Sequence, residues 1–413
     1  MGKILKEVIE NFYLAITPFI SNFLIFFLIL FKYITFTNFI LGYLFYCTIV
    51  YITTKTYLFY VKTPFNTRII EQCQSIKNPN FKQYFLFPFT FAQFVLLNIS
   101  AKQNISNHKK LYFEIENVDD EGTTLIWATN EPSQINHNNP VLFIMPGITG
   151  KCSDPYVKNI IGEGLLKEFD VVIYQMRTLS PEMKMPKNGY VNFCEDINNS
   201  LKKVRNKNKN KIFAIGYSYG ANLLTTYLGS KNMETNYISG GISVSNPFDM
   251  FICQRFGEDT LYESMIVHFE RNNYLAAVNN VNKFEKDKNR VINIDYLLEN
   301  FYVKHFDGEF FVKILGYRNA DDYYKGMSSA RFVKNINKPF LIISAKDDPI
   351  CPYRGIPMDD ICENENIIFI LTDKGAHSCY VENDKNLGFT PKQWMFKPAF
   401  EFLEFLRNDK KYM

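Results

Sequence analysis

A serine between two glycines lies at the junction of an apolar run and a helix-forming run. The apolar run from Ile212 to Ile215 leads into Gly216-Tyr217-Ser218-Tyr219-Gly220, and Ala221 to Leu228 follows. A serine hydroxyl is a poor nucleophile unless the chain lifts it onto a tight turn, where a base and two amides can reach it. Glycines two residues before and after leave room for that bend. The pattern predicts a strand, a turn and a helix, with Ser218 as a nucleophile.

Such a nucleophile requires a base that takes its proton and an acid that orients the base. Two later apolar runs end in suitable residues: Asp347-Asp348-Pro349 follows the first, and Gly375-Ala376-His377 follows the second. We expect His377 to be the base, because it lies just past a predicted strand in the chain order that this chemistry uses. We favour Asp348 as the acid, because the proline after it fixes the turn. Asp347 is expected to be solvated or to cap the turn.

Two backbone N–H groups must also face the position where negative charge develops on the substrate. We expect one from Tyr219, at the start of the helix that follows the nucleophile, where the helix dipole adds positive potential. We expect the other from Ile148, in the loop Pro146-Gly147-Ile148-Thr149-Gly150 after an earlier apolar run. A Pro-Gly pair after a strand is otherwise an ordinary turn signal, so its place in the chain order supports the assignment.

The elements that must position these residues are short apolar strands alternating with helical stretches. This rhythm predicts a mainly parallel, doubly wound sheet that binds ligands at the carboxyl ends of its strands, with the first two strands forming a hairpin. A helical, polar and aromatic insertion at about 248–335 interrupts it; the insertion is either a lid over the site or an ordinary helical addition. The eight predicted strands are 111–115, 123–128, 141–145, 171–176, 212–215, 238–244, 340–344 and 367–371.

With the four motif loops in this order, residues from about 110 to 410 resemble the abhydrolase-domain lipases of the YheT-like branch. Ser245-Asn246-Pro247-Phe248-Asp249 and Asp321-Asp322-Tyr323-Tyr324 leading to Ser328-Ser329 add to the resemblance. It implies an α/β-hydrolase fold and a serine hydrolase acting on acyl esters of glycerolipids or phospholipids. The family nucleophile, acid and base then fall on Ser218, Asp348 and His377, with no metal or organic cofactor. The chain departs from the family pattern at Thr178, Ala376 and Cys379, which are expected to change the shape of the site and not its chemistry.

The N-terminal stretch differs in composition from the rest of the chain. From Tyr13 to Val61 the only charged side chains are Lys32 and Lys55. Because a bilayer core needs about 20 mostly apolar residues as a helix, this stretch predicts one long transmembrane helix or two short ones. We therefore expect a membrane anchor over residues 1–62, with a cleaved signal peptide as the alternative. Its orientation and organelle stay open, the endoplasmic reticulum and the mitochondrial membrane being candidates.

The remaining boundaries follow from the anchor and the sheet. Residues 63–106 are expected to be a proline-broken connecting segment that lies against the membrane or the catalytic domain, and residues 107–413 to form the hydrolase domain. The net charge of +4 and a lysine-rich stretch at 202–211 without aromatic residues predict no nucleic-acid partner. The eight cysteines have no Cys-x-x-Cys pair, so neither a zinc site nor a dense disulfide framework is indicated.

The prediction from sequence is a membrane-anchored serine hydrolase that forms an acyl-enzyme on Ser218. Its expected partners are a lipid ester substrate, the bilayer and membrane proteins that contact the N-terminal helices. Two alternatives stay open: a catalytically idle hydrolase domain that serves as a structural subunit of a membrane assembly, and an acyltransferase that passes the acyl group to an alcohol.

Overall fold

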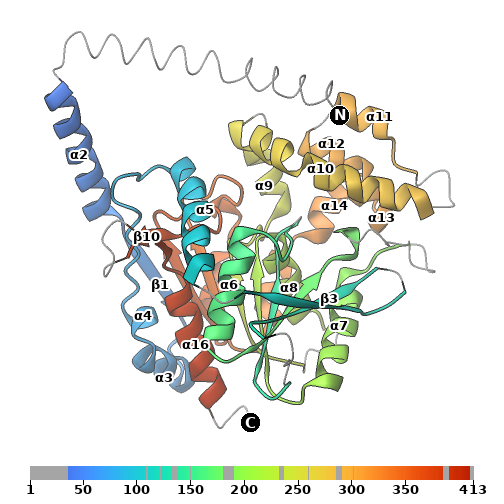
Figure 1. Cartoon of the computed structure of the whole chain (residues 1–413), viewed down its shortest axis with the longest axis horizontal. Helices are drawn as coiled ribbons and strands as arrows, with labels where there is room; N and C mark the ends of the chain where they lie inside the picture. Colours follow the sequence, from blue (N-terminus) through green and yellow to red (C-terminus); the bar gives the residue numbers. More distant parts are fainter. Residues whose placement is uncertain are drawn as a thin grey trace. The chain divides into compact units, whose positions relative to one another are not determined.

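The structure is a computed structural model, and the chain divides into two compact units, Met1–Thr53 and Thr54–Met413. In the first unit the described element is helix α2 (Phe36–Thr53), which carries no charged side chain (Figure 1). Residues 1–35, which hold much of the predicted anchor, lie outside the described residues. No helix within the described part combines the length and the apolarity that crossing a bilayer requires. The described residues are 36–107, 110–120, 122–131, 137–148, 150–179, 190–231, 237–258, 260–284, 291–300, 302–384 and 390–409.

The second unit is built on a nine-stranded, mostly parallel sheet in the order β1-β9-β8-β7-β6-β4-β5-β3-β2. All eight predicted strands are present, and β2 and β3 form the predicted hairpin. The six strands from β5 to β9 along this order are parallel, whereas β1, β2 and β3 run antiparallel to their neighbours. The strands are β1 (Thr56–Tyr60), β2 (Tyr112–Asn117), β3 (Thr124–Thr129), β4 (Val141–Met145), β5 (Asp170–Gln175), β6 (Ile212–Tyr217), β7 (Ile238–Val244), β8 (Phe340–Ala345) and β9 (Ile367–Thr372).

The ninth strand corrects both the predicted strand number and the predicted anchor boundary at residue 62. Strand β1 pairs with β9 at the edge of the sheet, with Thr56 opposite Thr372. Its side chains alternate between the two hydrophobic cores, and Phe59 stacks on Phe369 with the ring centroids 5.7 Å apart. An aromatic run such as Thr56–Tyr60 fits a membrane segment and a buried edge strand equally well, so composition alone could not place the boundary at Thr54.

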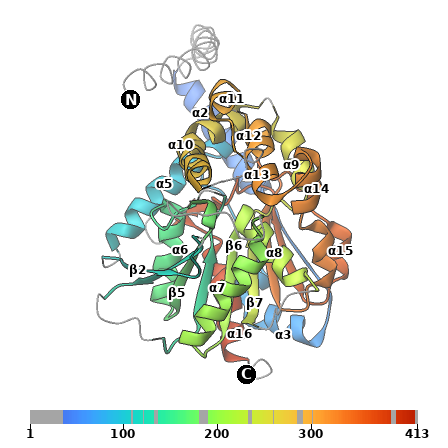
Figure 2. The same ribbon diagram turned by 90° about the vertical axis from the view of Figure 1, so that its right-hand side faces the viewer.

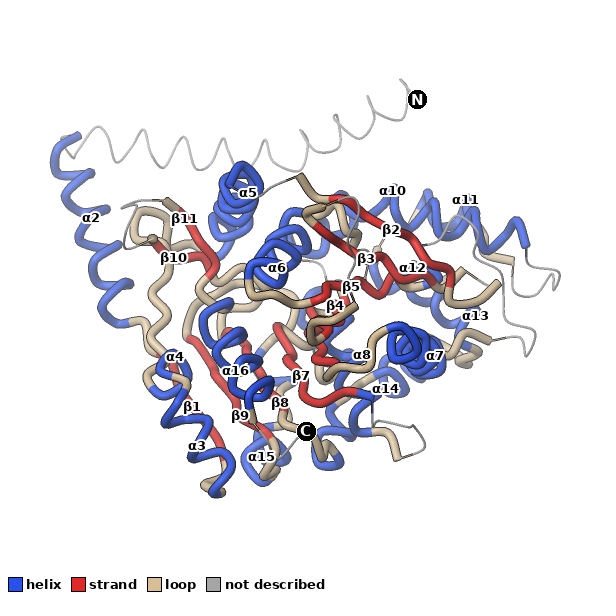
Figure 3. The backbone as a smooth tube through the Cα atoms, turned by 60° about the horizontal axis from the view of Figure 1, so that its bottom comes forward, coloured by secondary structure: helices blue, strands red, loops and turns tan. Residues whose placement is uncertain are grey.

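Helices cover both faces of the sheet (Figures 2 and 3). Helix α7 (Phe193–Lys207) shows why they form: Asn192 caps its N-terminus, and Phe193, Ile197, Leu201 and Val204 give it one buried stripe at helical spacing. One face carries α7, α8 (Tyr219–Gly229) and α15 (Met358–Glu363); the other carries α3 (Pro64–Gln72), α4 (Gln74–Lys77), α6 (Pro155–Leu166) and α16 (Phe396–Asn408).

The predicted connecting segment is therefore largely ordered and packed on the catalytic unit. Pro64 begins helix α3 behind the N-cap Thr63 and does not break a helix there. Helix α5 (Thr90–Asn107) contacts α6 and the small sheet of β10 (Val381–Asn383) and β11 (Pro391–Gln393).

The predicted insertion lies between β7 and β8 and is helical. Its aromatic residues Phe310, Phe311, Tyr323 and Tyr324 are buried and form part of the core of the insertion. Its elements are α9 (Met250–Gly257), α10 (Leu261–Phe284), α11 (Ile294–Glu299), α12 (Val303–Glu309), α13 (Phe311–Leu315), α14 (Ala320–Met327) and a 3-10 turn at Ala330–Asn335.

Candidate active site

Ser218 occupies the sharp turn between β6 and α8. Its backbone has φ 52° and ψ −119°, and its N–H donates to the carbonyl of Val244 at 2.9 Å. Both glycines of the motif are required: a Cβ on Gly216 would come within 2.6 Å of the Gly220 carbonyl oxygen, and one on Gly220 within 2.2 Å of the Met145 carbonyl oxygen. A non-glycine residue is strained at positive φ, and such strain persists where the surroundings impose it. The turn thus presents the Ser218 side chain at the carboxyl end of the central strand β6.

The predicted base, His377, and the predicted acid, Asp348, lie next to each other in the structure. Nδ1 of His377 lies 2.9 Å and 3.1 Å from the two carboxylate oxygens of Asp348. Asp348 is buried, and one of its oxygens accepts the N–H groups of Ile350 and Cys351 at 2.9 and 2.8 Å. Those bonds hold the carboxylate toward the imidazole. A carboxylate at Nδ1 fixes the tautomer that leaves Nε2 free to accept a proton.

Asp347 contacts the loop that carries His377, residues 375–380, which we call the histidine loop. Its carboxylate accepts the N–H of Ala376 at 3.0 Å and the hydroxyl proton of Thr90 at 3.0 Å. Burial raises the pKa of this carboxyl group above its usual range. Asp347 therefore caps the turn of the loop that carries His377.

The histidine loop is a strained segment held by its neighbours. Ala376, Ser378 and Tyr380 all have positive φ, at 52°, 60° and 46°. The N–H of Ser378 donates to the hydroxyl of Ser245 at 2.9 Å, which ties the loop to the end of β7. The sequence pointed to Ser245 only through the resemblance of residues 245–249 to the family. It did not point to Thr90, because nothing local links position 90 to position 347.

The loop proposed for the second oxyanion amide lies beside the nucleophile. A Cβ built on Gly147 would be 3.6 Å from Cβ of Ser218, and the N–H of Gly147 itself donates to the Tyr156 hydroxyl at 3.0 Å. Because its N–H is bonded to Tyr156, Gly147 does not offer this group to an oxyanion. Ile148 and Tyr219, the predicted donors, both line the same cavity as Ser218.

One contact of the expected triad is not made in this conformation. Within the described residues, no hydrogen bond joins the Ser218 hydroxyl to the His377 imidazole. Catalytic hydrogen bonds are often long before substrate binds and tighten only in the reacting complex.

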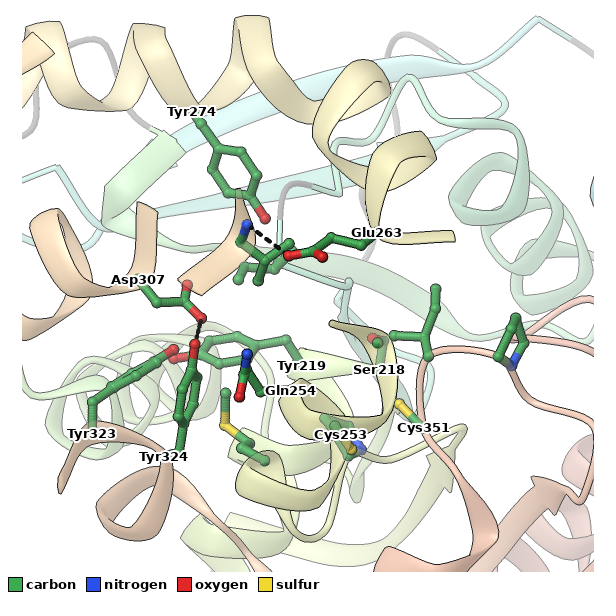
Figure 4. Close-up of a pocket in the computed structure, with 17 residues that line it drawn as sticks. Ser218, Tyr219, Cys253, Gln254, Glu263, Tyr274, Asp307, Tyr323, Tyr324 and Cys351 are labelled. Atoms are coloured by element: carbon green, nitrogen blue, oxygen red, sulfur yellow. Dashed lines mark hydrogen bonds between the residues drawn. The ribbon is translucent and has the colours of Figure 1, made fainter. Parts of the chain in front are cut away.

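A cavity of about 850 Å³, including the part open to solvent, extends from Ser218 to the insertion (Figure 4). Its far end carries two acidic groups: Asp307, which accepts the Tyr324 hydroxyl proton at 2.7 Å, and Glu263, which accepts the N–H of Val303 at 3.2 Å. Burial raises the pKa of Asp307 to about 7. The insertion thus forms one wall of the cavity. The lining residues from it include Met250, Cys253, Gln254, Gly257, Glu263, Tyr274, Val303, Asp307, Tyr323 and Tyr324.

Among the described residues, three potential metal ligands lie within 4.8 Å of one another: Asp348, Cys351 and His377. Two of them already face each other, and burial raises the pKa of the Cys351 thiol well above its usual range. A metal requires the thiolate, which that environment disfavours. The donor chemistry therefore fits an acid–base pair better than a metal centre.

The geometry agrees with comparisons to known proteins. A family model described as alpha/beta hydrolase fold matches residues 140–384. The protein EMB8 of Picea glauca, named embryogenesis-associated, is 29% identical over 280 residues, which cover 66% of this chain and 60% of that protein. Monoacylglycerol lipase of Saccharomyces cerevisiae is 29% identical over 282 residues, 65% of this chain and 60% of the lipase.

Phospholipase ABHD3 of Bos taurus is 26% identical over 286 residues, 68% of this chain and 67% of the phospholipase. The chain spans about 60% of the length of the first two relatives. These matches confirm the resemblance drawn from the sequence motifs.

Proposed function

This chain belongs to the alpha/beta hydrolase fold family, and we propose that it is a serine hydrolase that cleaves acyl esters of glycerolipids or phospholipids. The observation that carries the proposal is the strained turn of Ser218 at the same sheet edge as the His377–Asp348 pair. Two of its relatives are named as a lipase and a phospholipase.

In the proposed reaction, Nε2 of His377 takes the proton of the Ser218 hydroxyl as its oxygen attacks the ester carbonyl carbon. The amides of Tyr219 and Ile148 hold the resulting oxyanion. The carbon–oxygen bond to the alcohol then breaks, and His377 gives its proton to the departing oxygen. Water repeats the sequence on the acyl-enzyme and releases the fatty acid and free Ser218. Asp348 stabilises the imidazolium in both halves.

The cavity supports a lipid-type ester through its combination of apolar and polar walls. Its lining includes the apolar side chains of Ile148, Pro247, Met250 and Ile350, which suit an acyl chain. Its far wall carries Asp307 and Glu263, which suit hydroxyl or other donor groups of a head group. We propose the insertion as a lid on this basis.

Membrane anchoring through the N-terminal segment is part of the proposal. Its support is the sequence from residue 13 to 53, where Lys32 is the only charged residue. Extraction of membranes with alkaline carbonate tests it: the full chain should stay in the pellet and a chain that begins at Thr54 should not. Equal extraction of both would refute an anchor before Thr54.

Labelling by a fluorophosphonate probe tests the chemistry. The full chain should be labelled on one serine, and Ser218→Ala should abolish the labelling, whereas the control Ser230→Ala should keep it. A folded wild-type chain that takes no label would instead favour the idle structural subunit. Addition of an alcohol acceptor during ester turnover separates hydrolysis from acyl transfer, because only a transferase converts most of the acyl group to a new ester.

A further inference from the structure

Helix α5 exposes several apolar side chains and buries two polar ones. A helix on a protein surface normally turns its apolar stripe inward and its polar residues outward. In α5 the polar Gln93 and Ser100 are buried beside Leu96, whereas Phe91, Val95 and Ile99 are each about half exposed, at 51%, 50% and 42%. The three outward positions are four residues apart and so share one face of the helix.

The loop before the helix also exposes apolar side chains. Phe87 and Phe89 are also exposed, and no charged residue occurs between Lys82 and Lys102. We call Phe87, Phe89, Phe91, Val95 and Ile99 the α5 patch. Soluble proteins seldom expose a contiguous apolar area of this kind without a partner.

Leu96 packs with Ala376 and Val381, and hydrogen bonds add to this attachment of the helix. Gln93 accepts the N–H of Val381 at 2.9 Å, and Thr90 at the first turn donates to Asp347 at 3.0 Å. The N–H of Phe85 donates to Asn383 at 2.9 Å. The helix is thus fixed to the segment that carries His377, at the end of the sheet where the insertion helices lie (Figures 1 and 2). The outward apolar side chains take no part in this attachment.

The contacts of Thr54 indicate which partner covers the patch. Thr54 begins the catalytic unit, and its hydroxyl donates to Gln83 at 2.7 Å while Lys82 donates to its carbonyl at 2.6 Å. Residues 36–53, which precede Thr54 in the chain, are an uncharged apolar helix. Thr54, the residue that follows this helix in the chain, is thus bonded to the segment that leads into the α5 patch. Both α2 and the α5 patch are apolar and uncharged, which matches the chemistry of a lipid surface.

We propose that the α5 patch is a bilayer-docking surface that seats the catalytic unit on the membrane. An interfacial segment of this type buries its apolar face about 5–10 Å deep at the boundary of head groups and acyl chains. The docked helix then holds the histidine loop, through Thr90 and Gln93, against the surface from which a lipid ester would enter. The docking itself does not depend on the proposed hydrolysis.

The test uses the full chain with Phe91→Trp, mixed with vesicles of phosphatidylcholine that carry brominated acyl chains. The native Trp127 and Trp394 are buried, so they give a constant background. The indole at position 91 should show a blue shift and lose intensity to bromine quenching. The matched control is Leu166→Trp, an exposed apolar position at the C-terminal end of α6, beside Lys167, which pairs with Glu404 of α16. It should show neither effect.

A second variant measures the consequence. Phe91→Gln/Val95→Gln/Ile99→Gln should lower turnover of an ester embedded in vesicles by roughly tenfold or more relative to a soluble short-chain ester, because three apolar side chains leave the interface. The proposal would be overturned if vesicles that contain no other protein did not quench the indole at position 91. It would also be overturned if quenching required an added membrane protein. If the wild type fails on the soluble ester, the proposed hydrolysis fails, while the fluorescence still decides docking.

Discussion

Asp347 and Asp348 are neighbours in the chain, and their carboxylates hold one loop at two successive residues. Asp347 accepts the N–H of Ala376 at 3.0 Å, while Asp348 lies 2.9 Å from Nδ1 of His377. The first contact places the loop and the second orients the imidazole. The two residues should therefore respond differently to the same substitution.

Asp348→Asn should lower ester turnover by roughly ten-thousand-fold, because an amide at Nδ1 favours the wrong imidazole tautomer. Asp347→Asn keeps an acceptor for Ala376 and loses only the charge, so turnover should fall within about tenfold, the scale of one neutral hydrogen bond. Turnover of a soluble ester by both variants, with thermal unfolding to confirm the fold, checks this. Equal losses would mean that the assignment of the acid is wrong.

The turn at Ser218 should be intolerant of a single methyl group. Gly220→Ala should lower the thermal midpoint, because its Cβ would lie 2.2 Å from the Met145 carbonyl oxygen, and such overpacking costs about 1–3 kcal/mol or more. Gly308→Ala in α12 is the matched control, since nothing lies within 4 Å of its Cβ. That variant should gain about 0.5–1 kcal/mol from the better helix propensity of alanine. A stable Gly220→Ala would contradict the close approach of the turn to β4.

Asp307 should make stability depend on pH. Burial raises its pKa to about 7, so between about pH 4 and pH 7 the folded chain keeps a proton that the unfolded chain has lost. Stability therefore falls as pH rises through that window and levels off above it. Asp307→Asn still accepts the Tyr324 hydroxyl and should remove the fall, which is at most about 4 kcal/mol. Thermal midpoints from pH 5 to 8, with exposed Asp295→Asn as control, measure it; parallel curves for wild type and Asp307→Asn would refute it.

The sequence was informative where the chemistry is local. The turn of Ser218 needs glycines at fixed offsets, and the acid and base loops follow apolar runs, so their places could be predicted. Strand β1 could not, because Thr56–Tyr60 has the composition of the apolar stretch before it and its partner β9 is more than 300 residues away. The hydrogen bond from Thr90 to Asp347 was hidden for the same reason.

The ion pair after β5 gives the last prediction. Arg177, which is 3% exposed, forms a two-pronged ion pair with buried Asp196 and a further one with Asp119 at 3.1 Å. Burial raises the pKa of Asp196 to about 6 even beside the arginine. Arg177→Met leaves that carboxylate buried without its partner, which costs about 3–5 kcal/mol. The loss should be largest at pH 8 and smaller at pH 5, where Asp196 takes up a proton and becomes neutral. The double variant Arg177→Met/Asp196→Leu should recover much of it, because no unpaired charge then remains at position 196. Thermal midpoints of the three chains at both pH values are the measurement, and a loss that does not depend on pH would show that packing of the arginine, and not its charge, holds this part of the fold.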